Sequence, residues 1–459
     1  MKLHRLIRRA AILLCLCLVL PLCGCSMLNS SDLLTLPMIS PEHQQLLKLI
    51  NGVTGSTDWV TTNPAAGNNR LTTQFVDFYG DGIPEAVAFF KNTPEFRLRV
   101  TVYSKSGVSS YAELCSVEMN GEQIQRVEYA DLDGDGSQEM LVGVRYDTAA
   151  LYTLYAFSLR NGSAAELLNV TYNDFTLCDL LGDGRKEIFT IRDSEVEGAP
   201  IAELFHCEAG IMSSVGTAPV SPCVRTPLFL TSGRLNSDTP AIIAEGSFTD
   251  ASTDAIRYLS DVFIWQEEEG FRNLSYAEIF GQSFETQRSV SLRFSDVNAD
   301  GSMEFPIAVT MAQPASNPTA VPAGSAIRWY GYDPTGDVSA VADTWLSGDG
   351  TWMLTLPKSW RDCFYAQSRT KNDRRLVVFS ADDENGAPVE LLSICICSNA
   401  DNIPACTADG YERLAEYGGI WYGVLLNPDA PPALGLKDRA DVQARMIFLT
   451  AEKTYVKAR

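Results

Sequence analysis

Short apolar runs recur along this chain, and each follows a polar segment that contains aspartate and glycine. The runs are four or five residues long and include β-branched or aromatic residues, at positions 86–90, 140–144, 188–191 and 305–309. Apolar runs of this length, bounded by turn-forming residues, are typical of buried β-strands. The pattern therefore predicts a mainly β protein built from short strands.

The segment 131–139 shows what precedes such a run. Acidic side chains occupy its first, third, fifth and ninth positions, glycine occupies the sixth, and the seventh can offer a backbone carbonyl. This is the ligand spacing of a calcium loop of EF-hand type without the twelfth-position glutamate. The predicted ligands are Asp131, Asp133, Asp135, the Ser137 carbonyl and Glu139. Because a strand-like run follows at 140–144, we expect this loop to join strand to strand.

The same segment recurs five times, with its first position at residues 77, 131, 179, 234 and 296. A regular spacing of about 50 residues indicates a repeat architecture. Between two of these loops we expect strands at 140–144, 151–157, 165–170 and 176–178. Four short strands per repeat is the content of one propeller blade.

The copies resemble FG-GAP repeats, also called VCBS-type repeats, in which an Asp-rich loop opens each blade of an integrin-alpha-like β-propeller. The resemblance covers residues 65–345 and implies an all-β propeller of about five four-stranded blades, with room for a sixth or seventh. The alternative architecture is an array of β-sandwiches. Sandwiches, however, do not need an equivalent acidic loop every 50 residues.

The copies differ in how completely they supply calcium ligands. The loop at 131 has four carboxylates and is expected to bind most tightly. The loop at 296 is also complete, whereas Tyr79 and Leu181 replace the third ligand in the loops at 77 and 179. The further predicted ligands, including backbone carbonyls at the seventh positions, are Asp296, Asn298, Asp300, Ser302, Glu304, Asp77, Asp81, Ile83, Glu85, Asp179, Asp183, Arg185 and Glu187.

The copy at 234 is expected to be metal-free, because Arg234 stands in place of the first aspartate and Ala241 in place of the glutamate. The sequence thus predicts two to four structural calcium ions, which would offset repulsion among clustered carboxylates. The alternative for every loop is a metal-free turn, since Asp and Gly favour tight turns anyway.

The N-terminus has the features of an export signal. Lys2, Arg5, Arg8 and Arg9 precede an apolar run at 10–20 that is too short for an ordinary spanning helix. The run leads to Leu-Cys-Gly-Cys at 22–25, which resembles the bacterial lipobox. The resemblance implies a signal peptide at 1–24, lipid on Cys25 and anchoring to the outer face of the cytoplasmic membrane. The alternative is a generic signal peptide and release into the medium.

Residues 25–64 then form a tether and a short helix, with Leu46, Leu47 and Ile50 on its apolar side. After residue 345 the pattern changes. Residues 346–459 resemble the small α+β domain that follows such repeats in some clostridial lipoproteins. The glycine pair at 348 and 350 predicts a hairpin turn. We expect strands at 352–356, 375–379, 391–397 and 420–426 and helices at 411–417 and 437–453.

Charge and cysteine content limit the function classes. The leader holds four of the 36 basic residues, so the remaining 32 face 57 acidic residues, a net charge of −25. Such a surface repels nucleic acid. Cys395 and Cys397 share one face of a predicted strand, and the main expectation for the cysteines is that they are buried as small hydrophobic residues. The alternative is a disulfide, which the spacing of Cys207 and Cys223 would allow. The chain has no CxxC pair, so no zinc site is predicted.

Two function classes remain. The first is a binding or scaffold module that contacts a protein or glycan, with aromatic residues such as Tyr146, Trp265 and Trp329 as contributors or, alternatively, as blade packing. The second is a cell-surface hydrolase built on the propeller frame. No GxSxG, HExxH or P-loop motif is present, and His206 lies in a strand-like context, so the sequence favours a non-enzymatic role.

Overall fold

The computed structural model describes residues 41–459 except 56–57, 107–109, 147–151, 161, 195–198, 334, 372–373, 451–454 and 458–459. Every strand pairing in this described part of the chain is antiparallel, and helices are few. The predicted signal peptide and Cys25 lie outside the described residues. No helix in the described part is long and apolar enough to cross a membrane.

Four sheets of blade type come first. Sheet 1 contains β1 (Trp59–Thr61), β2 (Thr73–Val76), β3 (Glu85–Asn92), β4 (Arg97–Lys105) and β5 (Tyr111–Asn120). Sheet 2 contains β6 (Gln123–Ala130), β7 (Glu139–Arg145), β8 (Tyr152–Arg160) and β9 (Ser163–Tyr172). Sheet 3 contains β10 (Asp174–Cys178), β11 (Glu187–Asp193), β12 (Pro200–Glu208) and β13 (Ile211–Pro219). Sheet 4 contains β14 (Phe229–Arg234), β15 (Pro240–Thr249), β16 (Ile256–Gln266) and β17 (Gly270–Asn273). The predicted strands of the second repeat are confirmed.

Two larger sheets follow. Sheet 5 contains β20 (Phe305–Val309), β21 (Ser325–Tyr332), β22 (Val338–Leu346), β23 (Trp352–Thr355), β29 (Met446–Leu449) and β30 (Tyr455–Lys457). Sheet 6 contains β24 (Phe364–Lys371), β25 (Arg374–Asp382), β26 (Pro388–Cys397), β28 (Ile420–Leu426) and β27 (Glu412–Tyr417). A small hairpin of β18 (Tyr276–Ala277) and β19 (Gln282–Ser283) stands between sheets 4 and 5 in sequence.

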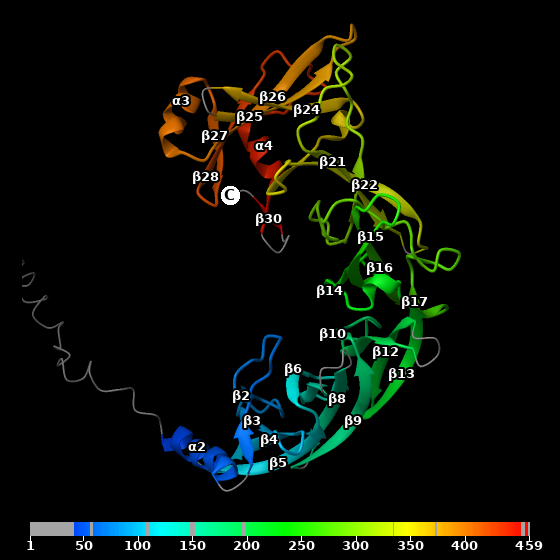
Figure 1. Ribbon diagram of the computed structural model, residues 1–459, viewed down its shortest axis with the longest axis vertical. Coiled ribbons are helices and arrows are strands. Elements are labelled where there is room, and N and C mark those ends of the chain that lie inside the picture. The colour runs from blue at the N-terminus through cyan, green and yellow to red at the C-terminus, as the bar shows by residue number, and fades with distance from the viewer. Residues whose placement is uncertain are drawn as a thin grey trace, which may run out of the picture.

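The sheets follow one another along an arc, from blue sheet 1 through the green sheets to the orange and red C-terminal part (Figure 1). Neighbouring sheets share hydrophobic cores. Phe89 of sheet 1 and Val142 of sheet 2 belong to one cluster, and Leu141 of sheet 2 and Ile188 of sheet 3 to the next. Central strands such as β7 are therefore buried on both faces, which explains why they are continuous apolar runs instead of alternating ones. The fold is all-β and propeller-like.

Each acidic loop lies at the same place in its sheet. The loops at 131, 179 and 234 join the first strand of their sheet to the second, from β6 to β7, β10 to β11 and β14 to β15. The loop at 77 likewise joins β2 to β3 in sheet 1, which has the extra strand β1 before them. In sheet 5 the first strand is reduced to a single bridge between Ser295 and Glu304, after which β20 begins. The prediction that these loops join strand to strand is confirmed.

The segment between sheets 4 and 5 is irregular and is held by buried polar contacts. The Asp261 carboxylate accepts hydrogen bonds of 2.7 Å from the backbone N–H and hydroxyl of Ser221, and another from the Ser283 hydroxyl. Arg288 forms a buried ion pair with Glu245. Pairing these groups avoids the cost of leaving buried charges without partners.

The C-terminal region corrects two predicted helices. Residues 412–417 form strand β27, because Leu414 and Ala415 are buried at a sheet edge that pairs with β28. The predicted helix at 437–453 is limited to α4 (Arg439–Arg445), because the buried run Met446–Leu449 pairs with β23 instead. The other helices in the described residues are α2 (Pro41–Thr54), α3 (Ile403–Ala408) and the 3-10 turns η2 (Pro222–Val224), η3 (Lys358–Trp360) and η4 (Ala400–Asn402).

Other predictions in and around this region fare better. The predicted strands at 352–356, 375–379, 391–397 and 420–426 correspond to β23, β25, β26 and β28. The hairpin turn at residues 348–350 joins β22 to β23, so sheet 5 extends past the expected boundary at 345. Leu46 and Ile50 of α2 are buried as predicted, whereas Leu47 is exposed. Cys207 and Cys223 are separate thiols, not a disulfide.

Candidate metal-binding loops

The loops that start at 77, 131, 179 and 296 share one hydrogen-bonded frame. The ninth-position glutamate is buried and accepts the backbone N–H of the second residue, at distances of 3.1, 2.8, 2.7 and 3.0 Å. The first aspartate accepts the N–H of the sixth-position glycine at 2.8, 2.9, 3.1 and 2.9 Å. These glycines have φ between 82° and 90°, a left-handed conformation that disfavours other residues.

The loop at 296 gathers carboxylates that have no cationic partner in the described part of the chain. One oxygen each from Asp296, Asp300 and Glu304 lies within 4.8 Å of the others. No ion pair to these three is present within the described part of the chain. Burial, with the charges of Asp300 and Asp296, raises the pKa of Glu304 to about 8. The predicted ligand Asn298 is adjacent, its Nδ2 donating to Asp300 at 2.8 Å. This oxygen-rich cluster suits a hard divalent cation.

The loop at 131 has a similar cluster, but an arginine forms ion pairs with two of the loop's aspartates. Asp131, Asp133 and Glu139 each place an oxygen within 4.8 Å of the others. The Oε1 atom of Glu139 is buried and makes no hydrogen bond within the described structure, and burial raises the pKa of this group to about 7. These properties fit a cation. Arg160, from the end of β8, bonds to Asp133 and lies 3.0 Å from Asp135. Its side chain is about half exposed, so it can move away.

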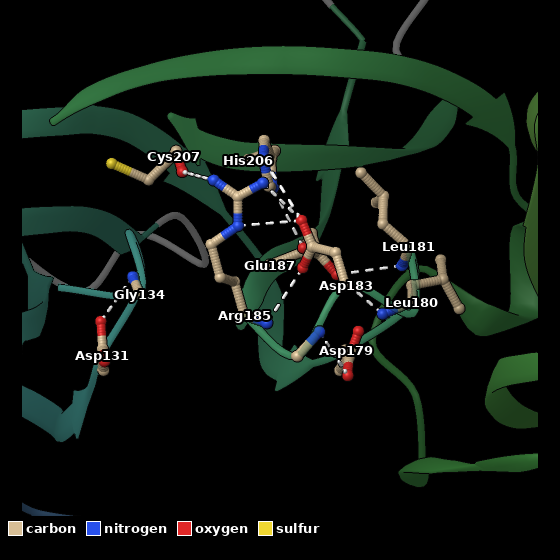
Figure 2. A network of polar contacts seen from close by, with 11 residues as sticks. Asp131, Gly134, Asp179, Leu180, Leu181, Asp183, Arg185, Glu187, His206 and Cys207 are labelled. Atoms are coloured by element: carbon tan, nitrogen blue, oxygen red, sulfur yellow. Dashed lines mark hydrogen bonds and ion pairs between the residues drawn. The ribbon is translucent and has the colours of Figure 1, made fainter. Parts of the chain in front are cut away.

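The loop at 179 contains its own cation, Arg185, as Figure 2 shows. Arg185 donates from Nε to Asp183 at 2.8 Å and from Nη1 to the Cys207 carbonyl at 3.3 Å. Burial opposes ionisation of Asp183, but the hydrogen bonds from Arg185 outweigh it and lower the pKa of this carboxyl. His206, on β12, lies 3.1 Å from Glu187 through Nδ1. The side chain of Arg185 thus supplies the positive charge that balances Asp183, although Asp183, Glu187 and His206 also place one ligand atom each within 4.8 Å of the others.

The two remaining loops are poorer candidates. Asp77, Asp81 and Glu85 adopt the shared frame but do not gather into a tight oxygen cluster in the described structure. In the copy at 234, Arg234 donates to the Ser237 carbonyl within its own turn. Asn236 accepts the backbone N–H groups of Asp238 and Thr239 at 3.0 Å each, which makes an amide-stabilised turn without an acidic cluster.

Three groups that alter these loops could not be found from the loop sequences. Arg160 and His206 come from the third strand of their sheets, 21 and 19 residues after their loops end, and only strand pairing brings them to the loops. Arg185 was predicted as a carbonyl ligand, whereas its side chain forms the dominant contact. No signal in the motif distinguishes a solvent-facing residue at the seventh position from one that turns back onto Asp183.

A separate cavity of about 590 Å³ lies between sheet 4 and sheet 5. Its walls combine aromatic and charged side chains, among them Phe284, Tyr330, Arg257, Glu285 and Gln287. Nearby, Phe280 and Phe284 stack with ring centroids 4.6 Å apart and are both about half exposed. Trp329 is fully buried and serves packing, whereas Tyr146 is exposed.

No protein-family model and no curated protein matches the chain. Among solved structures, the exotype rhamnogalacturonan lyase YesX is 11% identical with a TM-score of 0.27, covering 73% of this chain and 68% of its own. A Bacillus licheniformis rhamnogalacturonan lyase is 12% identical at a TM-score of 0.28, covering 72% and 71%. TolB from Acinetobacter baumannii is 11% identical at a TM-score of 0.23, covering 74% and 66%. Likenesses this distant carry no functional argument.

Proposed function

We propose that this chain is a membrane-anchored, extracytoplasmic lipoprotein whose calcium-stabilised, propeller-like region binds a protein or glycan. The observation that carries the binding role is the cavity between sheets 4 and 5, with Phe284 in its wall and the exposed Phe280 stacked on Phe284 beside it. Concave sites with apolar walls and a few polar groups are the usual form of ligand pockets. Aromatic faces beside charged and amide groups suit a sugar ring or an aromatic peptide side chain.

The acidic loop at 296 connects the proposed calcium to the proposed ligand site. Glu304 ends this loop, and the next residue, Phe305, lines the cavity together with Ile307 of β20. A cation that fixes the loop would therefore also fix the start of the strand that forms the cavity wall. The metal is structural in this proposal, and it supplies charge balance to the carboxylates.

The ligand role is tested with the Phe280→Ala/Phe284→Ala double variant on arrays of cell-envelope glycans and peptides. We expect the double variant to lose at least tenfold in affinity for whichever ligand the unmodified protein binds. Ile211→Ala is the matched control, because Ile211 is also exposed but lies on sheet 3. Equal losses in both variants would contradict the cavity as the site. Cleavage of a bound glycan would instead support the alternative, a cell-surface hydrolase.

The anchoring role is tested at Cys25, which the lipobox resemblance singles out. Cys25→Ser should release the protein into the medium or leave the leader uncleaved, because the serine hydroxyl does not accept the thioether-linked lipid. Detergent-phase partitioning of the cell fraction measures this. An unchanged partitioning would show that another segment holds the protein at the membrane.

A further inference from the structure

Three cysteines meet in the C-terminal region, outside every acidic loop. Cys395 and Cys397 alternate along β26 and so face the same side of the sheet, and Cys406 reaches them from α3. All three are buried. The Cys406 sulfur lies 2.9 Å from each of the other two, and the Cys395 and Cys397 sulfurs are 3.7 Å apart.

The two separations of 2.9 Å are shorter than ordinary packing contacts. Non-bonded carbon atoms pack at about 3.5–4.0 Å, and sulfur is larger than carbon. The three sulfurs lie within 4.8 Å of one another, the arrangement of a shared ligand site. One ion at about 2.3 Å from each sulfur would hold the sulfurs roughly 4 Å apart, so binding would spread the 2.9 Å pairs. A disulfide would join two of them and leave the third sulfur pressed against the bond.

A buried cation stands beside the cluster. Arg374 is almost fully buried and lies against Cys406. Its Nη2 donates to Asp409 at 2.6 Å, while its Nη1 has no hydrogen-bond partner within the described structure. An N–H donor left open in the interior is costly, and thiolate sulfur is the acceptor that the cluster can provide. A neutral disulfide would not provide it.

We propose that Cys395, Cys397 and Cys406 bind one thiophilic d¹⁰ metal ion, Cu(I) or Zn(II), as a three-thiolate site. Thiolates are the ligands that select such ions, with metal–sulfur distances of about 2.3 Å. Each thiol releases its proton as its sulfur binds the ion, and the Arg374 charge offsets part of the negative charge of the three thiolates. The ion ties the six-residue helix α3 to the sheet at β26.

The walls of the site favour the three-coordinate ion over the four-coordinate one. Leu376, Val378 and Trp421 belong to the same buried cluster as the cysteines. Structural zinc is almost always four-coordinate. No fourth His, Cys or carboxylate joins the three sulfurs within the described part of the chain. Cu(I) is therefore expected to bind more tightly than Zn(II), and titration with each ion separates the two.

The test uses the full mature chain, stripped of metal under anaerobic reducing conditions and kept in saturating calcium. Cu(I) supplied from a colorimetric chelator, and Zn(II) in a parallel titration, should bind at one ion per chain and protect three thiols from alkylation. Cys406→Ser should bind none at that affinity. Cys363→Ser, a partly exposed cysteine outside the cluster, should still bind one.

Two results would overturn the proposal. One is the absence of stoichiometric binding of either ion to the unmodified protein. The other is a disulfide among the three cysteines, found by mass spectrometry of the protein alkylated in denaturant without reductant. If Cys406→Ser fails to fold, the titration and thiol protection of the unmodified protein decide the matter alone.

Discussion

The loops at 296 and 179 use the same backbone frame but balance their charge in different ways. In both, the first aspartate bonds the sixth-position glycine and the ninth glutamate bonds the second residue. At 296 the clustered carboxylates have no cation in the described structure, and the pKa of Glu304 is raised to about 8 by burial and by its neighbours. At 179, Arg185 bonds Asp183 and lowers its pKa against the effect of burial.

This difference shows that the motif has two separate roles, which are to hold the turn between two strands and to carry negative charge. The aspartates, the glycine and the glutamate hold the corner between two strands whether or not a metal is bound, because their hydrogen bonds go to backbone N–H groups. The charge of the same residues can then be balanced by an external ion or by an arginine of the chain. The loop at 131 is intermediate between the two cases. Its Glu139 Oε1 has no hydrogen-bond partner in the described structure, but its Asp133 forms an ion pair with Arg160.

Removing calcium is the strongest way to test this comparison. Binding to the folded state alone stabilises it by about 2.7 kcal/mol per site at a hundredfold excess over Kd. We expect a chelator to lower the melting temperature of the mature chain and calcium to restore it, measured by calorimetry. Identical melting curves in chelator and in millimolar calcium would mean that the carboxylates at 296 are stable without an ion.

Substituting single aspartates should then show which loops bind calcium, the complete loops or the degenerate one. Asp300→Ala and Asp135→Ala each remove a fifth-position ligand, so each should lower the calcium stoichiometry by one and forfeit about 2.7 kcal/mol of calcium-dependent stability at a hundredfold excess over Kd.

Asp238→Ala is the matched control, because the loop at 234 already has Arg234 in place of the first aspartate and Ala241 in place of the glutamate. It should leave the stoichiometry unchanged. Titration calorimetry of the three variants decides the point, and equal losses in all three would refute a graded set of calcium sites.

Stability against pH should differ between the ion-free and the calcium-loaded protein. Burial raises the pKa of Glu139 to about 7 and that of Glu304 to about 8, above the ordinary value of 4.5. The folded state then holds these protons more tightly than the unfolded state. Stability of the ion-free protein should therefore fall as pH rises from about 4.5 towards 8.

Calcium replaces those protons, so its apparent affinity should rise over the same interval. Urea unfolding at pH 5, 6, 7 and 8, with chelator and with calcium, measures both effects. Glu139→Gln/Glu304→Gln should flatten the ion-free profile. A fall that persists in this double variant would assign the pH dependence to other groups.

Arg160 offers a smaller test within the loop at 131. Its ion pairs with Asp133 and Asp135 compete with a metal for the same oxygens. The Arg160 side chain is about half exposed, and ion pairs of exposed side chains contribute about 0.2–1 kcal/mol, so Arg160→Ala should tighten calcium binding at this loop by up to about fivefold. Arg192→Ala, which removes a pair with Glu203 elsewhere, is the control. Weaker calcium binding in Arg160→Ala would show that the arginine supports the loop instead of competing for it.

The smallest effect is expected at Arg185. Arg185→Ser leaves Asp183 without its partner, and Asp179 already has a buried oxygen with no hydrogen bond in the described structure. Without calcium, the variant should lose about 1 kcal/mol or less of stability. Added calcium should restore it through a new weak site, seen as one extra ion per chain at millimolar concentrations. A loss that calcium does not restore would show that Leu181 and His206 also prevent metal binding.

The sequence by itself determined the repeat, the loop frame and the central strands. Asp131, Gly136 and Glu139 act on backbone groups within nine residues of one another, so their spacing encodes the turn that they form. The run at 140–144 is apolar throughout because β7 is covered on both faces by neighbouring sheets. Local hydrogen bonds and the burial of a single strand depend on residues that are close together in the chain, so the sequence pattern predicts them.

Only the tertiary structure decided which charges meet and where the C-terminal strands pair. Arg160 and His206 reach their loops across paired strands, and Cys406 meets Cys395 and Cys397 through the fold of α3 onto β26. Residues 446–449 became β29 because a partner strand, β23, about 90 residues earlier offered an edge. Contacts of this kind depend on how segments far apart in the chain pack. Ion pairs and strand-edge pairings between such segments produce no regular pattern in the sequence, so the sequence does not predict them.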